Sequence, residues 1–243
     1  GRAGPEWLTP ETADILAQAT DLVGYGPYLD RVAAGHQRRH ASDNREELDR
    51  AGHALDMAAE GARVAVVSGG DPGVFAMAAA VLEALDRDEE GRWAEVAVTV
   101  HPGVSAMQAA AARLGAPLGA DFCAISLSDN LKPLEVVERR VRLAAEAELV
   151  MALYNPASRA RPWQLGRVLS VIAEVHPPET PVIFATAAGR EQEHLTVTTL
   201  GEADPARADM RTLVLVGIPA TRVMQGPDGA VQVYTPRYYR GAE

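Results

Sequence analysis

The sequence predicts an α/β fold built from two tandem domains. Apolar stretches rich in β-branched residues alternate with amphipathic helical patterns, as expected for sheets covered by helices. A segment rich in glycine and proline, "GAPLGAD" (115–121), interrupts this alternation near the middle of the chain. We therefore predict domains at 1–117 and 118–243, the second with more strands per helix.

The first predicted domain opens with a helix that follows a capping pair. Thr9 can cap this helix and Pro10 suits its first turn, so we expect it to run to about Thr20. Residues 42–61 have the spacing of a capped amphipathic helix that ends at a glycine. Short apolar strands are expected at 21–25, 62–68 and 94–100. A further helix is expected at about 74–87, and residues 101–115 are expected to form a turn and an alanine-rich helix that ends at Gly115.

The second predicted domain resumes the alternation after the interrupting segment. Its strands are short runs of apolar and β-branched residues, the type that suits buried positions in a sheet. They are expected at 122–128, 148–156, 181–188, 194–200 and 212–218. Its helices are expected at about 133–147 and 162–175.

Composition excludes several classes of protein. The chain has 243 residues and a net charge of −10, which argues against binding to a phosphate backbone. Its apolar runs are all shorter than the roughly 20 residues of a membrane helix. The single cysteine, Cys123, excludes an intramolecular disulfide and a multi-cysteine zinc site. With no signal-peptide pattern at its start, we expect a cytoplasmic enzyme that has no metal site and binds neither nucleic acid nor membrane.

Three small, polar loops follow predicted strands. They are the segments 69–72 (Gly-Gly-Asp-Pro), 102–106 (Pro-Gly-Val-Ser-Ala) and 154–158 (Tyr-Asn-Pro-Ala-Ser). Ligands of open α/β sheets bind beyond the carboxyl ends of the strands, which is where these loops lie. Each loop taken alone is more often a simple turn, and no dinucleotide or P-loop fingerprint is present.

Arginine clusters occur in spite of the acidic net charge. They include residues 38–40, 139–142 and 159–161. One interpretation is that these side chains are solvated on helix faces and loop ends. The alternative is an anion-binding cleft for a small polycarboxylate, to which Arg159 and Arg161 would contribute because they follow a strand-end loop.

Several motifs together resemble the tetrapyrrole methylases. "SGGDPGVF", "HPGVSAMQAAAARLGAPLG" and "LVMALYNPAS" are similar to the cofactor loops of that family. "SDNREELDRA", "DFCAISLSDNLKP" and "YNPASRARPWQL" are similar to its precorrin-3B C17-methyltransferases, which act in cobalamin biosynthesis. The resemblance covers nearly the whole chain.

The resemblance implies a cofactor, a substrate and a reaction. S-adenosyl-L-methionine (SAM) would bind between the two domains and leave as S-adenosyl-L-homocysteine. The tetrapyrrole substrate, precorrin-3B, would be methylated at C17 with contraction of the ring, which gives precorrin-4, and the enzyme would be a homodimer. The cofactor contacts carried over from the family are Gly69, Gly70, Asp71, Val74, Ser105, Ala106, Asn155 and Ala187.

The segment "SLSDNLKP" (126–133) is the candidate for the proton transfers of ring contraction. Lys132 is the only lysine of the chain, and a desolvated lysine can lose its proton whereas an arginine cannot. Asp129 is the second catalytic candidate, although Ser-Asp-Asn is also a common turn and cap sequence. Asn130 is expected to bind the substrate with Arg159 and Arg161.

The chain departs from the family pattern at its start. The family opens with a strand and a Gly-Pro-Gly loop, and Gly1 matches the last glycine of that loop. We therefore expect the first strand to be missing from this chain, and to belong either to upstream residues or to a longer fused protein.

Three functional alternatives remain open from the sequence. The nearest is another precorrin or cobalt-precorrin C-methyltransferase of the same family. The others are an RNA ribose methyltransferase on the same fold, which the acidic charge disfavours, and a non-catalytic tetrapyrrole-binding protein.

Overall fold

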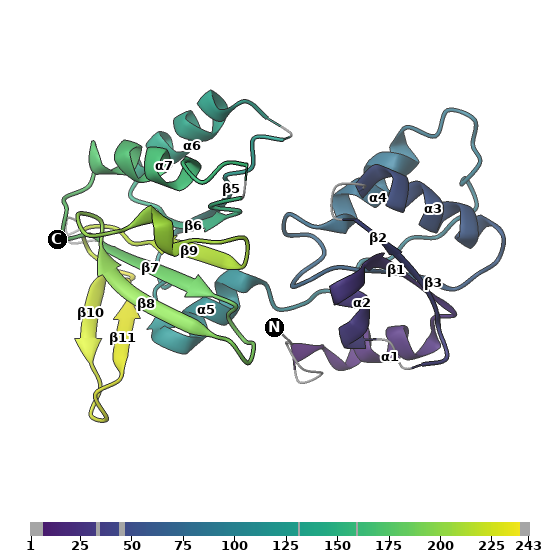
Figure 1. Cartoon of the computed structure of the whole chain (residues 1–243), viewed down its shortest axis with the longest axis horizontal. Coiled ribbons are helices and arrows are strands. Elements are labelled where there is room, and N and C mark those ends of the chain that lie inside the picture. The colour runs from purple at the N-terminus through teal and green to yellow at the C-terminus, as the bar shows by residue number, and fades with distance from the viewer. Residues whose placement is uncertain (1–6, 33–34, 44–46, 131, 159, 239–243) are drawn as a thin grey trace. The chain divides into compact units, whose positions relative to one another are not determined.

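The computed structural model describes residues 7–32, 35–43, 47–130, 132–158 and 160–238. Residue contacts divide the chain into an N-terminal unit, Arg2–Ser105, and a C-terminal unit, Ala106–Glu243 (Figure 1). Both units mix helices and strands, so the predicted α/β class with two tandem domains is confirmed. The division falls before the helix at 106–114, earlier than the predicted boundary at 117, because that helix packs on strands of the C-terminal unit.

The N-terminal unit contains a parallel three-stranded sheet with the order β2-β1-β3. Its strands are β1 (Asp21–Tyr25), β2 (Arg38–Ser42) and β3 (Val64–Val67), and its helices are α1 (Pro10–Gln18), α2 (Gly26–Val32), α3 (Glu47–Ala59) and α4 (Met77–Asp86). Helix α1 starts as predicted, since the Thr9 hydroxyl accepts a hydrogen bond from the Thr12 amide at 3.1 Å. Helices α3 and α4 share an apolar cluster that contains Leu55, Met77 and Trp93.

A buried carboxylate organises the amino ends of β1 and β2. Asp21 begins the central strand and is fully buried. It accepts hydrogen bonds from Nε and Nη2 of Arg38, both at 2.9 Å, and lies 2.9 Å from His40 Nε2. These side chains therefore stabilise the sheet at the end opposite to the strand-end loops. Residues 38–40 belong to strand β2, which the sequence pattern did not predict.

The predicted strand at 94–100 is wrong, because these residues adopt no regular structure. They are extended by sequence type, but they form no backbone ladder with β3 in the described part of the chain. Instead, residues 96–104 and the β3 residues 64–67 line one cavity. Val98 and Val100 line this cavity and are partly exposed, at 36% and 49%.

The C-terminal unit is built on a five-stranded mixed sheet with the order β5-β6-β9-β7-β8. These strands are β5 (Phe122–Ser126), β6 (Val150–Tyr154), β7 (Pro181–Thr186), β8 (His194–Thr199) and β9 (Thr212–Val216). Helices α5 (Ala106–Leu114), α6 (Leu134–Glu146) and α7 (Gln164–Ala173) accompany it. All eight elements lie where the sequence predicted them, apart from differences at their ends.

Alternating side chains of this sheet build two apolar clusters. Met151 and Leu153 of β6 pack with α6 and α7, whereas Ala152 between them packs with α5 and β11. The small second sheet, β10-β11-β4, was not predicted. Its strands are β4 (Gly115–Ala116), β10 (Arg222–Gln225) and β11 (Val231–Tyr234), and a short 3-10 helix, η2, covers Pro205–Arg207.

Candidate functional site

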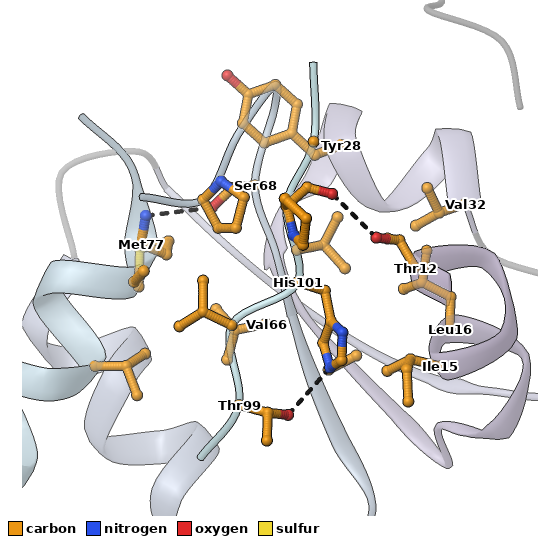
Figure 2. A pocket seen from close by; sticks show the side chains of 18 of the residues that line it. Thr12, Ile15, Leu16, Tyr28, Val32, Val66, Ser68, Met77, Thr99 and His101 are labelled. Carbon is orange, nitrogen blue, oxygen red and sulfur yellow. Dashed lines mark hydrogen bonds between the residues drawn. The ribbon is translucent and has the colours of Figure 1, made fainter. Parts of the chain in front are cut away.

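The N-terminal unit contains a largely apolar cavity of about 310 Å³. Figure 2 shows side chains of α1, β3 and the segment through Thr99 and His101 around it. The predicted cofactor residues Gly69 and Gly70 lie at the cavity together with Gly103. The loop that follows β3 and the loop that precedes α5 therefore meet at one place, although the second loop follows no strand.

Asp71 joins the two loops. Its Oδ1 accepts a hydrogen bond from the Gly73 amide at 2.8 Å, and its Oδ2 accepts one from the Gly103 amide at 3.1 Å. Both hydrogen bonds are donated by backbone amides, so the carboxylate has no side-chain counter-ion in these contacts. The group is partly exposed, and its remaining lone pairs can accept from a hydroxyl or an ammonium group of a ligand.

The glycines of this loop are required by backbone geometry as well as by any ligand. Gly70 has φ of 83°, a left-handed conformation that β-branched residues avoid. A Cβ on Gly103 would lie 2.4 Å from the Gly70 carbonyl oxygen, so the loops can approach this closely only without a side chain. Gly69 is covered by the Tyr28 ring, whose Cζ would lie 2.9 Å from an added Cβ.

Val74 and Ser105 are the other predicted cofactor residues of the N-terminal unit. The Val74 amide donates to the Asp71 carbonyl at 3.2 Å, which closes the turn after the two glycines. Ser105 is buried, with 2% of its surface exposed, and ends the second loop. Val74 thus belongs to the turn that starts at Asp71. The burial of Ser105 favours a structural role for its side chain, in addition to any contact with a ligand.

In the C-terminal unit, the loop after β6 has an unusual backbone. Asn155 has φ of 52°, and its side-chain Nδ2 donates to Ser126 Oγ at the end of β5, at 2.9 Å. The hydroxyl of Tyr154 accepts from the Met107 amide at 3.2 Å, in the first turn of α5. Met107 and Tyr154 follow and precede the predicted residues Ala106 and Asn155 in the chain. Their hydrogen bond therefore places these two predicted residues close together.

Ala187 is also held in a left-handed conformation. Its φ is 53°, its side chain is buried, and its amide donates to the Arg211 carbonyl at 3.0 Å. Non-glycine residues with positive φ are uncommon and concentrate at functional sites. Asn155 and Ala187 both follow sheet strands, which supports the assignment of ligand contacts to these two loops.

The segment after β5 carries a cluster of charged and amide side chains. Arg161 Nε lies 2.9 Å from Asp129 Oδ1, and Arg161 Nη2 donates to Asn130 Oδ1 at 2.5 Å. The structure therefore brings together three of the predicted catalytic and substrate residues. Arg159 lies outside the described residues.

Lys132 lies on the same segment. Its ammonium group donates to the Ser128 carbonyl at 3.4 Å. Burial and, to a lesser extent, the charge of Arg140 lower the pKa of Lys132 below its ordinary value. A lysine with a lowered pKa can exchange a proton nearer to neutral pH, as the sequence argument required of this residue.

Cys123 and His101 are two further residues with reactive side chains. Burial raises the pKa of the Cys123 thiol, which suits an unreactive core residue. His101 lies between Glu11 and Thr99, at 3.2 and 3.1 Å, and lines the cavity (Figure 2). The described residues contain no group of side chains suited to a metal ion, and no described helix is long and apolar enough to cross a membrane.

Sequence reasoning missed two residues that shape these loops. Tyr28 covers Gly69, and Ser126 holds Asn155. Tyr28 belongs to the unpredicted helix α2, so no signal in the sequence pointed to it. Ser126 ends a predicted strand next to the candidate loop, and its position there is a signal that could have indicated a role.

Comparison with known proteins identifies the family. The family model of tetrapyrrole (corrin/porphyrin) methylases matches residues 1–204. The precorrin-3B C(17)-methyltransferase of a Sinorhizobium species is 58% identical over 243 residues, which cover 100% of this chain and 95% of that protein. The probable cobalt-factor III C(17)-methyltransferase of Salmonella typhimurium is 38% identical over 241 residues, covering 98% of this chain and 96% of that protein.

A solved structure agrees with this assignment. The crystal structure of the methyltransferase CobJ is 52% identical, with a TM-score of 0.90, and the match covers 97% of this chain and 95% of that chain. The shared fold, the strand-end loops and the family match lead to one conclusion. This chain belongs to the tetrapyrrole methylases.

Proposed function

We propose that this protein uses SAM to methylate precorrin-3B at C17, with contraction of the ring to give precorrin-4 in cobalamin biosynthesis. The observation that carries the proposal is the 58% identity, along the whole chain, to a protein with that named activity. The loop geometry supports it, because the motifs shared with the family form the Asp71-linked loops and the strained Asn155 turn.

SAM supplies an activated methyl group, so the protein's main task in methylation is alignment of the two reactants. In the N-terminal unit, Gly69, Gly70, Asp71, Val74 and Ser105 are the proposed contacts. Asp71 fits the role because its carboxylate is fixed by two amides and has further acceptor capacity. In the C-terminal unit, Ala106, Asn155 and Ala187 are the proposed contacts, and Asn155 Oδ1 is left as an acceptor when Nδ2 binds Ser126.

Ring contraction requires protons to move, and Lys132 is the proposed residue for that step. Its lowered pKa allows the ammonium to give up a proton more readily than an exposed lysine. Asp129 is the second catalytic candidate taken from the sequence. Arg159, Arg161 and Asn130 are proposed to bind the substrate, whose carboxylates match the positive charge of the two arginines.

The main competing function is methylation of the cobalt-containing counterpart. The higher identity to the precorrin-3B enzyme than to the cobalt-factor III enzyme favours the cobalt-free substrate. The test incubates the purified protein and SAM with precorrin-3B or with cobalt-factor III, and analyses the products by mass spectrometry. We expect a methylated, ring-contracted product from precorrin-3B, formed at least tenfold faster than any product from cobalt-factor III. A preference for the cobalt compound would overturn this assignment.

We also propose that the protein acts as a homodimer in the cytoplasm. The family resemblance supports the homodimer. The single cysteine fits a reducing compartment such as the cytoplasm. Light scattering coupled to size-exclusion chromatography measures the mass directly. A dimer is expected at micromolar concentration, and a monomer that retains full activity would contradict it.

A further inference from the structure

Arg161 is held by side chains from a neighbouring strand end. Asp129 and Asn130 follow β5, whereas Arg161 follows β6, and these two strands pair in parallel with Ser126 opposite Tyr154. Their carboxyl ends therefore lie side by side, where ligands of such sheets bind. Asp129 lies against Nε of the guanidinium as an ion pair, and Nη2 donates to Asn130, so two residues hold this group.

The guanidinium retains donors for a ligand. Arginine has five N–H donors in a planar fork, and Nη1 has no partner among the described residues. The Arg161 side chain is 31% exposed, so solvent reaches it, while Asp129 is 21% exposed. A planar group with a fixed orientation and a free edge suits bidentate recognition of a carboxylate.

Two buried polar atoms beside Arg161 lack hydrogen bonds among the described residues. They are Asp129 Oδ1 and Ser158 Oγ. Asp129 Oδ1 lies 2.9 Å from Arg161 Nε, but the N–H direction is poorly aligned, so this contact is an ion pair without a good hydrogen bond. Ser158 exchanges backbone hydrogen bonds with Arg161, at 3.0 and 3.4 Å. Unpaired buried polar atoms are uncommon, and of these two only the Ser158 hydroxyl has a hydrogen to donate to a substrate carboxylate, since Asp129 Oδ1 faces Arg161.

The role of Asp129 changes in this arrangement. Its carboxylate lies against the Arg161 guanidinium, a position that suits holding this side chain in place. Asp129 Oδ1 is directed to Arg161, whereas Lys132 donates to the Ser128 carbonyl. The geometry therefore separates the charged pair from the residue suited to proton transfer.

We propose that Arg161 anchors a carboxylate of the tetrapyrrole and that Asp129, with Asn130, is a positioning residue that orients this guanidinium. This inference rests on the proposed function for the identity of the substrate. It reassigns Asp129, which the sequence pointed to as a catalytic group, and leaves Lys132 as the candidate for proton transfer. The expected signature is a change in substrate KM rather than in kcat.

The test compares Asp129→Ala, Arg161→Ala and the double variant in a steady-state assay with precorrin-3B and SAM. We expect substrate KM to rise about tenfold or more in each single variant, with kcat within about twofold of wild type. The double variant should be no worse than Arg161→Ala, because Asp129 acts through Arg161. The pH profile of kcat should keep both limbs in Asp129→Ala.

Two matched variants separate this effect from a general loss of charge or fold. Arg167→Ala removes an arginine of α7 whose ion pair is with Glu138 of α6, and it should leave KM unchanged. Arg161→Lys keeps the charge but loses the fork, so it should recover only part of the lost affinity. SAM affinity, measured by titration calorimetry, should be unchanged in all Asp129 and Arg161 variants.

Other results would overturn the inference. A fall in kcat with normal KM, loss of one limb of the pH profile, or additive effects in the double variant would make Asp129 a catalytic acid or base. Direct binding of uroporphyrin III, a stable polycarboxylate, provides a readout that does not depend on turnover. The anchor is refuted if Arg161→Ala binds uroporphyrin III as well as wild type does, or if wild type does not bind it. Failure of precorrin-3B turnover alone refutes only the proposed function.

Discussion

The shape of the loop after β3 depends on single residues with different tasks. Gly70 supplies a positive φ, Gly69 makes room for Tyr28, and Asp71 fastens the loop to Gly103. A bulky side chain at Gly70 would therefore strain the backbone whether or not a cofactor lies nearby. Substitutions of Asp71 give a clearer test of cofactor binding.

We expect Asp71→Asn to weaken SAM binding by about tenfold. Asparagine keeps one oxygen acceptor for the loop amides but removes the charge that would attract the ammonium or orient hydroxyls of SAM. Titration calorimetry measures the Kd, and circular dichroism checks the fold. Asp228→Asn, on the exposed turn between β10 and β11, is the matched control and should have no effect. An unchanged Kd in Asp71→Asn would limit this carboxylate to a structural role.

Lys132 can be tested separately from methyl transfer. Lys132→Met removes the amine and keeps most of the stem, so we expect normal SAM affinity but at least a tenfold loss of ring-contracted product, in line with the 10²–10⁴ typical of general acid–base catalysis. Because burial lowers the pKa of Lys132, the limb of the pH–rate profile that belongs to it should lie below the range of a free lysine and vanish in this variant. Product analysis by mass spectrometry measures both steps.

Lys132→Arg decides what the amine does. If Lys132 only holds a substrate carboxylate by its charge, arginine should restore most of the rate. If the amine exchanges a proton, arginine should fail, because it stays protonated. Full activity in both variants would remove Lys132 from the reaction.

At the scale of the elements, the sequence correctly predicted those helices and strands whose formation depends on neighbouring residues in the chain. The Thr9-Pro10 start of α1 and the apolar runs of β6 and β7, which are buried almost throughout, were confirmed. Strand β2 was missed because "RRH" is too charged for a strand by itself, and it is stabilised by Asp21, far away in sequence. Residues 94–100 were wrongly predicted as a strand, since an apolar pattern cannot show whether a pairing partner lies beside it.

The Asp21 carboxylate should stabilise the N-terminal sheet in a pH-dependent way. The hydrogen bond from Arg38 is the largest cause of a pKa held well below its ordinary value, and it outweighs the opposing effect of burial. For a depressed carboxylate pKa, the stabilisation is present above the ordinary value of about 3.9 and is lost as pH falls toward the folded-state pKa.

We therefore expect Asp21→Asn to destabilise the protein by about 1–3 kcal/mol at neutral pH, since it leaves buried hydrogen-bonding groups poorly paired. The difference from wild type should shrink in acid. Urea unfolding followed by tryptophan fluorescence measures it. Asp30→Asn is the control. Asp30 is exposed and pairs with Arg39, so this ion pair should contribute little to the free energy of unfolding. Equal stability of wild type and Asp21→Asn would contradict the argument.

At the scale of the whole molecule, the sequence predicted the loops of the site better than the contacts within it. The loops after β3 and β6 could be found because each follows a strand, whereas the loop at 102–106 was placed by an expected strand that these residues do not form. The pairing of Asp129 with Arg161 could not, because it joins residues on two different loops whose side-chain directions depend on the packed sheet. The Arg159 prediction lies outside the described residues and stays a prediction.

Net charge and local charge act in opposite directions on a polycarboxylate substrate. The chain carries −10, so its long-range field repels the substrate, and salt weakens that repulsion as the screening length falls from about 30 Å at 0.01 M to 8 Å at 0.15 M. Attraction by Arg161 acts at contact distance, and salt weakens it as well. The sign of the salt dependence shows which of the two effects dominates.

We expect substrate KM of the wild type to rise with salt between 0.01 and 0.15 M, because contact with arginine dominates when the substrate is bound. In Arg161→Ala that attraction is reduced while the repulsion stays, so KM should rise less steeply or fall. Steady-state kinetics at several salt concentrations, with SAM saturating, measures both slopes. Arg167→Ala removes the same charge elsewhere and should keep the wild-type slope, which separates a local anchor from a change in net charge. Equal slopes in wild type and Arg161→Ala would place Arg161 outside the substrate's contact range, whatever the slope of the control.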